Sequence, residues 1–229
     1  MMKLHILVSL AFLGLTVLGE MEAIAQNNNF SLSLAVGAGN SGFSRENQNE
    51  DELKRIFYPT GGLQVHKRIN TKWAINIYPN VGLSGNRRTL DIPAGNITEV
   101  RSTSAFLNLG LHPKYYFGES IYLSLGPEIS YLLWNNASTY AGNDRQSSIR
   151  ETELFNRTNL FVSAATGIAK KIGEARENAP LQMDAWWFLE FRAKHGITNI
   201  LNDNFFGAGT SSTISAFEIV MGISFLTKK

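Results

Sequence analysis

Of the four histidines in the chain, three follow residue 25, and they are the side chains best suited to proton transfer near neutral pH. They are His66, His112 and His195. A hydrolase would need one of them within hydrogen-bond reach of a serine or a carboxylate. Ser211 and Ser212 are candidates for His195, but alternation along the chain places His195 on the apolar face of its segment. We therefore expect no catalytic site and no enzymatic turnover.

The same three histidines stand singly, without the close histidine or carboxylate spacing that a metal site requires. The chain also has no cysteine, which excludes disulfides, thiolate metal ligands and a thiol nucleophile. We expect neither a metal nor any other cofactor.

A larger group of charged and titratable side chains has one property in common, because each stands on the polar face of a segment whose other face is apolar. The group consists of His66, Arg68, His112, Lys114, Glu128, Glu190, Arg192, Lys194 and Glu218. If the apolar faces meet lipid, a charge on the lipid side near the midplane costs roughly 2–4 kcal/mol, so these side chains should point inward. We interpret them as a lumen charge network of buried ion pairs and hydrogen bonds.

The elements that hold these side chains are predicted to be β-strands. From Phe30 to Gly39 and from Ile121 to Trp134, apolar residues alternate with small or polar ones, which is the period of a strand. The same alternation predicts six more strands, over residues 61–69, 73–83, 103–117, 159–172, 185–197 and 214–226. The fold class is therefore all-β, an eight-stranded antiparallel up-and-down transmembrane β-barrel. A barrel of this size has an interior that side chains fill, so the network is expected to plug it.

Connection lengths between the predicted strands support this topology. Long polar connections, over residues 40–60, 84–102, 135–158 and 198–213, alternate with short ones at 70–72 and 118–120. Outer-membrane barrels have long outer loops and short periplasmic turns. The connection over 173–184, which contains Pro180, breaks the pattern and is interpreted as an elaborated periplasmic turn.

The first 25 residues are interpreted as a cleaved signal peptide. Residues 6–19 are apolar but too short to span a bilayer as a helix, which takes about 20 residues. Ala23-Ile24-Ala25 matches the small-x-small pattern of a cleavage site. We expect residues 26–229 to form the barrel domain in the outer membrane of the cell, with both termini periplasmic. The near balance of 21 basic and 19 acidic residues gives no support for nucleic-acid binding.

Aromatic residues cluster near the predicted periplasmic ends of the strands, where barrels carry an aromatic girdle. The predicted girdle consists of Trp73, Tyr115, Tyr116, Phe117, Tyr122, Trp186, Trp187 and Phe225. Because these aromatic residues lie at one level of the predicted barrel, they favour a membrane barrel over a soluble one.

Two stretches of the predicted barrel wall carry a family resemblance, Leu109–Gly118 (LGLHPKYYFG) and His195–Ile200 (HGITNI). Both resemble segments of the PorT-like outer-membrane β-barrel proteins of Gram-negative bacteria, and the similarity covers essentially the whole mature chain. The resemblance implies a small barrel with no appended domain and no catalytic residue set. The namesake branch of that family is associated with protein secretion.

These observations predict a structural or binding role through the long extracellular loops. The expected partners are outer-membrane lipid, lipopolysaccharide, and an envelope or secretion protein. Arg87, Arg88, Arg101 and Arg157, near the outer ends of strands, could pair with lipopolysaccharide phosphates. The alternatives are a narrow pore, an accessory component of a secretion or envelope complex, and a soluble lipocalin-like barrel that turns its apolar faces inward.

Overall fold

The computed structural model describes residues 30–45, 53–89, 99–141, 144–150, 152–173, 183–201 and 212–227. The predicted signal peptide and most of the predicted elaborated turn, residues 174–182, lie outside this range. Among the described residues, no helix is long and apolar enough to cross a bilayer.

The described part of the chain consists almost entirely of strands, with a single 3-10 turn at Thr152–Leu154. The strands are β1 (Phe30–Arg45), β2 (Leu53–Arg68), β3 (Trp73–Thr89), β4 (Glu99–Phe117), β5 (Ile121–Ala141), β6 (Asp144–Arg150), β7 (Thr158–Gly173), β8 (Met183–Gly196) and β9 (Ser212–Thr227).

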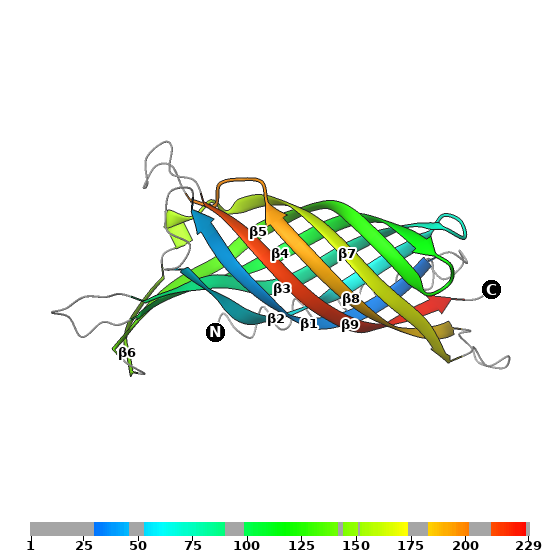
Figure 1. The fold of residues 1–229 in the computed structure, drawn as a ribbon, viewed down its shortest axis with the longest axis horizontal. Helices are drawn as coiled ribbons and strands as arrows, with labels where there is room; N and C mark the ends of the chain where they lie inside the picture. The colour runs from blue at the N-terminus through cyan, green and yellow to red at the C-terminus, as the bar shows by residue number, and fades with distance from the viewer. Residues whose placement is uncertain are drawn as a thin grey trace, which may run out of the picture.

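Eight of the nine strands close into a barrel, which confirms the predicted fold (Figure 1). All neighbours pair antiparallel, in the order β4-β3-β2-β1-β9-β8-β7-β5-β6, and β4 also pairs with β5. The barrel is therefore closed by two contacts, between β1 and β9 and between β4 and β5. The extra strand, β6, pairs with the far end of β5 and lies outside the closed ring.

The two ends of the barrel differ in their connections. At one end, which we call the turn end, β2 joins β3 through residues 69–72 and β4 joins β5 through residues 118–120. Gly118 has φ of 80° there, a left-handed conformation that glycine adopts without a steric penalty. A third connection at the turn end, from β7 to β8, is longer and spans residues 174–182. The opposite end, which we call the loop end, carries β6 and the longest connection, from β8 to β9 (Figure 1).

Strand ends agree with the prediction within two residues at the turn end, but the strands are longer at the loop end. β1 continues to Arg45, β3 to Thr89 and β5 to Ala141, into segments expected to be loops. The predicted boundaries are wrong there because both faces of these extensions are polar. A strand whose two faces are both polar has no apolar alternation to reveal it.

Alternation along each strand places apolar side chains outside and polar ones inside. On β5, for example, exposed and buried residues alternate without interruption from Ile121 to Leu133. Leu125 on the outer face is 59 % exposed, whereas Glu128 on the inner face is 2 % exposed. A water-soluble barrel would have the reverse arrangement, so the described surface is that of a protein surrounded by lipid.

Candidate functional site: the barrel interior

The centre of the interior holds an ionic cluster of Lys114, Glu128, Glu190, Arg192, Lys194 and Glu218, all 8 % exposed or less. Glu190, Arg192 and Lys194 follow one another at every second residue of β8, so the strand period points all three inward. The other three come from β4, β5 and β9. Three cations therefore face three carboxylates across the lumen.

Glu190 lies at the turn-end side of the ionic cluster and binds two cations. One carboxylate oxygen, Oε2, is 3.4 Å from Lys114 Nζ. The other, Oε1, accepts a hydrogen bond of 3.1 Å from Arg192 Nε and a second one from Nη2 of the same guanidinium. The arginine and the glutamate are at most 1 % exposed, so water does not screen this pair.

The remaining ion pairs continue the ionic cluster toward the loop end. Arg192 Nη1 is 3.6 Å from Glu218 Oε2. Lys194 Nζ lies between two carboxylates, 2.9 Å from Glu128 Oε1 and 3.1 Å from Glu218 Oε1. Each buried charge thus has an opposite charge within reach, which the low polarity of a protein interior requires.

Three tyrosines that were not assigned to the network contact its charged groups. The Tyr58 hydroxyl donates to Glu218 Oε1 at 3.0 Å, and the Tyr122 hydroxyl donates to Glu190 Oε2 at 3.0 Å. The Tyr78 ring lies under Arg192, with 4.0 Å from the guanidinium carbon to the ring centroid. For Tyr78 and Tyr122 the inward parity was the available signal, because every second residue of β3 and β5 points into the lumen.

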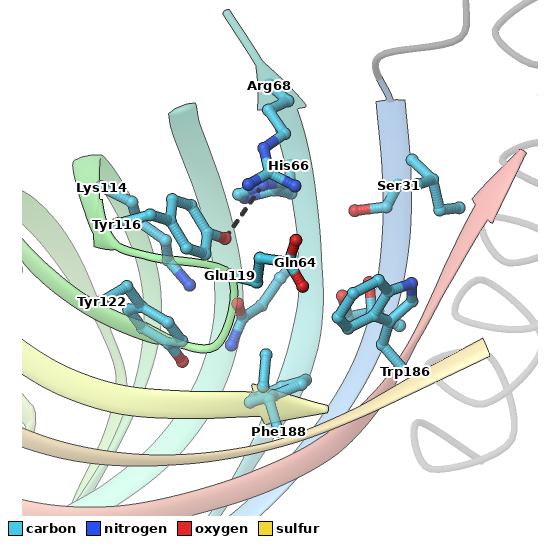
Figure 2. Close-up of a pocket in the computed structure, with 14 residues that line it drawn as sticks. Ser31, Gln64, His66, Arg68, Lys114, Tyr116, Glu119, Tyr122, Trp186 and Phe188 are labelled. Carbon is cyan, nitrogen blue, oxygen red and sulfur yellow. Dashed lines mark hydrogen bonds between the residues drawn. The ribbon is translucent and has the colours of Figure 1, made fainter. Parts of the chain in front are cut away.

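The structure separates the predicted network into parts. His112 is buried beside the ionic cluster, and its Nε2 is 2.7 Å from Ser163 Oγ. His66 and Arg68 lie instead at the turn end, where His66 Nε2 is 3.3 Å from the Tyr116 hydroxyl (Figure 2). Neither His66 nor Arg68 makes a described ion pair with a carboxylate of the ionic cluster.

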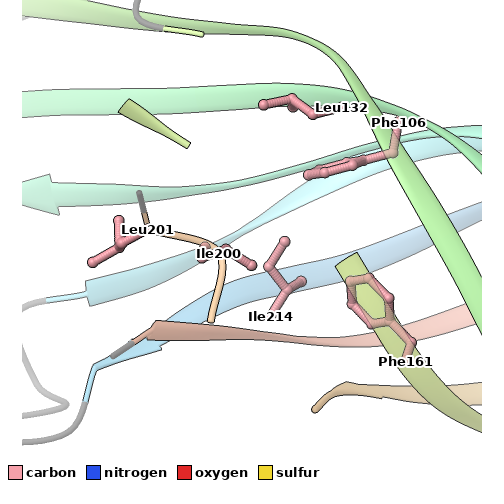
Figure 3. Packing of buried hydrophobic residues seen from close by; sticks show 6 residues of the cluster. All are labelled: Phe106, Leu132, Phe161, Ile200, Leu201 and Ile214. Atoms are coloured by element: carbon pink, nitrogen blue, oxygen red, sulfur yellow. The ribbon is translucent and has the colours of Figure 1, made fainter. Parts of the chain in front are cut away.

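Uncharged side chains fill the lumen between the ionic cluster and the loop end. Asn108 Nδ2 donates to Asn80 Oδ1 at 2.8 Å, and Asn135 Nδ2 donates to Ser104 Oγ at 2.7 Å. An apolar closure lies between these two polar pairs along β4 and β5, and it is formed by Phe106, Leu132, Phe161, Ile200, Leu201 and Ile214 (Figure 3). The chain after β8 supplies Ile200 and Leu201, and the Asn156 side chain holds this segment by donating to Leu201 O at 2.8 Å.

Two of the cavities in the described interior lie on opposite sides of the ionic cluster. The larger one, at the turn end, has about 80 Å³ of room for water and is lined partly by His66, Arg68 and Tyr116. The smaller one, of about 30 Å³, lies between the ionic cluster and the apolar closure, next to Phe161 and Lys194. The side chains between the two cavities interrupt any straight path along the lumen.

The predicted aromatic girdle is divided between the two faces of the wall. Trp73, Tyr115 and Phe117 lie outside and pack edge to face, with ring centroids 5.0 Å apart in both pairs. Trp187 and Phe225 share the outer face by strand parity.

The other three predicted girdle residues point inward, so their assignment to the girdle is wrong. Tyr116 and Tyr122 are 9 % and 1 % exposed, and Trp186 lines the turn-end cavity. The physical reason is that neighbouring residues of a strand face opposite sides, so depth alone does not identify a lipid-facing ring.

The residues considered for catalysis do not come together. His195 is exposed on the outer face, where its Nδ1 is 2.9 Å from Ser215 Oγ. Ser212 is 2 % exposed on the opposite face, and Ser211 lies outside the described residues. No group of three or more histidine, cysteine or carboxylate side chains in the described ranges could hold a metal ion.

The arginines near the loop end are partly engaged within the chain. Arg87 Nε is 2.8 Å from Glu99 Oε2, and Arg101 pairs with the other oxygen of the same carboxylate. Arg157 Nη1 donates to the Tyr131 hydroxyl at 3.3 Å. The side chain of Arg88 lies outside the described part of the chain.

Comparison with known proteins shows which protein family the sequence matches. A family model described as an outer membrane protein beta-barrel domain matches residues 24–202. No curated protein matches the sequence.

Solved structures with a similar fold include Ail, the attachment invasion locus protein of Yersinia pestis, at 10 % identity and a TM-score of 0.44, covering 86 % of this chain and 99 % of that one. Neisserial surface protein A is similar at 13 % identity and a TM-score of 0.38, covering 85 % and 96 %. OprG of Pseudomonas aeruginosa is similar at 11 % identity and a TM-score of 0.35, covering 86 % and 95 %.

Proposed function

The chain belongs to the outer membrane protein β-barrel family, and we propose that it acts in that membrane by binding a partner, without transport and without enzymatic turnover. The observation that carries this proposal is the sheet that projects from the loop end. Binding functions concentrate on such segments because a rigid scaffold holds them in place while their surface is free to vary.

The projecting sheet is built on β5. The last residue of β5 that pairs with β7 is Tyr131, which lies opposite Thr158. β5 nevertheless continues to Ala141, which adds about 30 Å of strand at roughly 3.3 Å per residue. β4 accompanies it on one side as far as Glu99, opposite Tyr140, and β6 pairs with it on the other (Figure 1). A membrane-spanning strand needs only about 9–11 residues, so this sheet extends into water.

The outer edge of β6 is open. Within the described residues β6 pairs only with β5, and every residue from Asp144 to Arg150 is exposed. An open edge offers unpaired backbone N–H and C=O groups to an incoming strand. We therefore expect a partner that adds an extended segment to β6, with specificity from side chains at alternate positions.

The alternative functions fit the geometry less well. A pore would require a water path past Arg192 and Glu190, which fill the lumen with side chains at most 1 % exposed. A lipocalin-like binding barrel needs an apolar interior, whereas here the interior carries the ionic cluster. Lipopolysaccharide recognition remains part of the proposal as a second partner, supported by Arg157 on the exposed surface.

Two finer expectations also belong to this proposal. Export through a cleaved signal peptide, residues 1–25, would bring the chain to the outer membrane. Membership of the wider PorT-like family, which Leu109–Gly118 and His195–Ile200 resemble, is the second; these wall segments do not place the chain in the branch associated with secretion, and a secretion or envelope protein is one candidate partner.

Photo-crosslinking in living cells tests the proposal. Benzoylphenylalanine placed at Ser147 on β6 should give a protein adduct, and the same group at Leu125 on the lipid-facing part of β5 should give none. Ser147 is exposed and lies opposite Thr139, so the substitution leaves the barrel intact. Adducts at Leu125 only, or at neither position, would contradict binding through the projecting sheet.

A further inference from the structure

The turn end of the barrel holds a cavity that the proposed binding function does not use. We call it the entrance cavity (Figure 2). Its room for water, about 80 Å³, is several times the roughly 10–15 Å³ that one water molecule needs. Its walls are partly aromatic, with Tyr116, Tyr122 and Trp186, and partly polar, with Ser31 and Ser33.

Three hydrogen-bond donors in the wall of the entrance cavity are buried and have no acceptor among the described residues. They are Gln64 Nε2, Arg68 Nε and Trp186 Nε1. Gln64 is only 2 % exposed, and its Oε1 already accepts a hydrogen bond of 3.2 Å from Asn76 Nδ2, which turns Nε2 away from that partner. A buried donor without an acceptor is unfavourable, so three around one cavity indicate that the cavity holds a species that accepts hydrogen bonds.

The type of acceptor follows from the donors. A guanidinium and an indole N–H can only donate, so neither can satisfy the other. Arg68 makes no ion pair with a carboxylate in the described part of the chain. Its Nη2 donates to Thr71 O at 3.2 Å, and its guanidinium carbon lies 4.9 Å from the centre of the Tyr116 ring. These contacts fix the guanidinium but leave its charge without a counter-ion.

The remaining charges of the entrance cavity wall are unevenly placed. Lys114 adds a second cation, although Glu190 partly neutralises it at 3.4 Å. Glu119 is the carboxylate among the lining residues, and it is exposed on the turn after Gly118. The buried part of the cavity is therefore positive and the rim carries the negative charge.

We propose that the entrance cavity binds a small oxyanion, a carboxylate or a phosphate, held by Arg68, Gln64 and Trp186. The anion accepts hydrogen bonds from the three unpaired donors, and the charge of Arg68 strengthens them. The aromatic walls exclude bulk water from these bonds, which increases their strength. Glu119 at the rim opposes entry by charge repulsion and keeps the affinity moderate.

The indole N–H signal of Trp186 provides a direct test. The folded full-length barrel in detergent micelles, labelled with ¹⁵N, is titrated with sodium phosphate and, separately, with sodium acetate at constant ionic strength. The chain has four tryptophans, so Trp186→Phe identifies the signal by its loss. We expect a saturable shift of this signal with at least one of the two anions. The anion that binds with the higher affinity identifies the ligand as a phosphate or a carboxylate.

Two variants on the same strand separate a site from a general charge effect. Arg68→Gln should weaken anion binding by about tenfold or more, because one charge-assisted hydrogen bond contributes about 1.5–3 kcal/mol. Lys67→Gln is the matched control, since Lys67 is exposed on the opposite face, with its Nζ 5.0 Å from the centre of the Phe30 ring. It removes the same charge and should leave the affinity unchanged. Glu119→Gln should strengthen binding.

Several results would overturn the proposal. An indole signal that moves with neither anion would mean that the entrance cavity holds water only. An equal shift with sodium chloride, or an equal loss of affinity in Lys67→Gln, would reduce the effect to charge screening. Gel mobility before heating shows whether Arg68→Gln has folded. If it has not, the anion titration of Glu119→Gln tests the proposal instead. A weaker affinity in that variant would contradict the site.

Discussion

At the scale of single residues, the interior is defined by charges that share partners. Lys194 contacts two carboxylates and Glu190 contacts two cations, whereas Lys114 and Glu128 each make one ion pair among the described residues. Buried pairs of this kind add little net stability, since desolvation opposes the attraction between the charges. Removing one partner is different, because it leaves an uncompensated charge in a site that excludes water.

Glu190→Gln should therefore destabilise the barrel by about 3–5 kcal/mol, because Lys114 and Arg192 both lose their nearest negative charge. The double variant Glu128→Leu/Lys194→Met removes one carboxylate and one cation together, and Glu218 keeps Arg192 and the Tyr58 hydroxyl as partners. It should therefore lose less than about 1.5 kcal/mol, as volume-conserving changes do. Urea unfolding in lipid vesicles, followed by tryptophan fluorescence, measures both. Equal losses would show that packing sets the stability and the unpaired charge does not.

The sequence predicts which charges face inward, since strand period two is a local property, but it does not predict which of them meet. Whether Lys194 reaches Glu128 or Glu218 depends on registers between strands far apart in the chain. The closure by Ile200 and Leu201 was not predicted either, because a short apolar pair after a strand has no periodicity. Tyr58 was missed because it stands in a segment expected to be a loop.

At the scale of elements, the strands combine a lipid-facing part and a water-exposed part. β5 shows both, with an apolar outer face up to Leu133 and polar residues from Asn135 onward. Apolar residues alternate with polar ones only where one face of the strand contacts lipid. The sequence therefore predicts the lipid-facing part of the strand and does not predict the water-exposed part. The sheet that carries the proposed function therefore lies where sequence patterns are weakest.

Two arginine substitutions on β5 distinguish these parts. Leu125→Arg should cost roughly 2–4 kcal/mol if Leu125 lies near the bilayer midplane, and it should reduce assembly into vesicles. Ala137→Arg, farther along the same strand in the projecting sheet and paired with Ile149 of β6, should have no effect, because this part of the sheet lies in water. Assembly is measured by the change in gel mobility on heating. Comparable assembly of both variants would mean that the assigned faces or depths are wrong.

At the scale of the whole molecule, the closed ring of strands and its filled interior have a consequence for permeability. The ionic cluster and the apolar closure lie one behind the other along the lumen, so a solute would have to displace both. We therefore expect the barrel to act as a support for its surface and its turn-end cavity, and not as a conduit.

The purified barrel should give no stepwise conductance in planar bilayers at any applied voltage that the bilayer tolerates. The same sample should run faster on a gel before heating than after it, which establishes that the protein tested is folded. A voltage-independent conductance in a sample with this heat-dependent mobility would contradict the filled lumen and support the narrow pore.

The apolar closure also decides which compartment the entrance cavity communicates with. In the proposed orientation the turn end faces the periplasm, and Phe106, Leu132 and Phe161 stand between the cavity and the cell surface. Solutes would then reach the cavity from the periplasm and not through the barrel from the cell surface. A periplasmic anion would occupy the cavity according to its periplasmic concentration, whatever binds at the loop end.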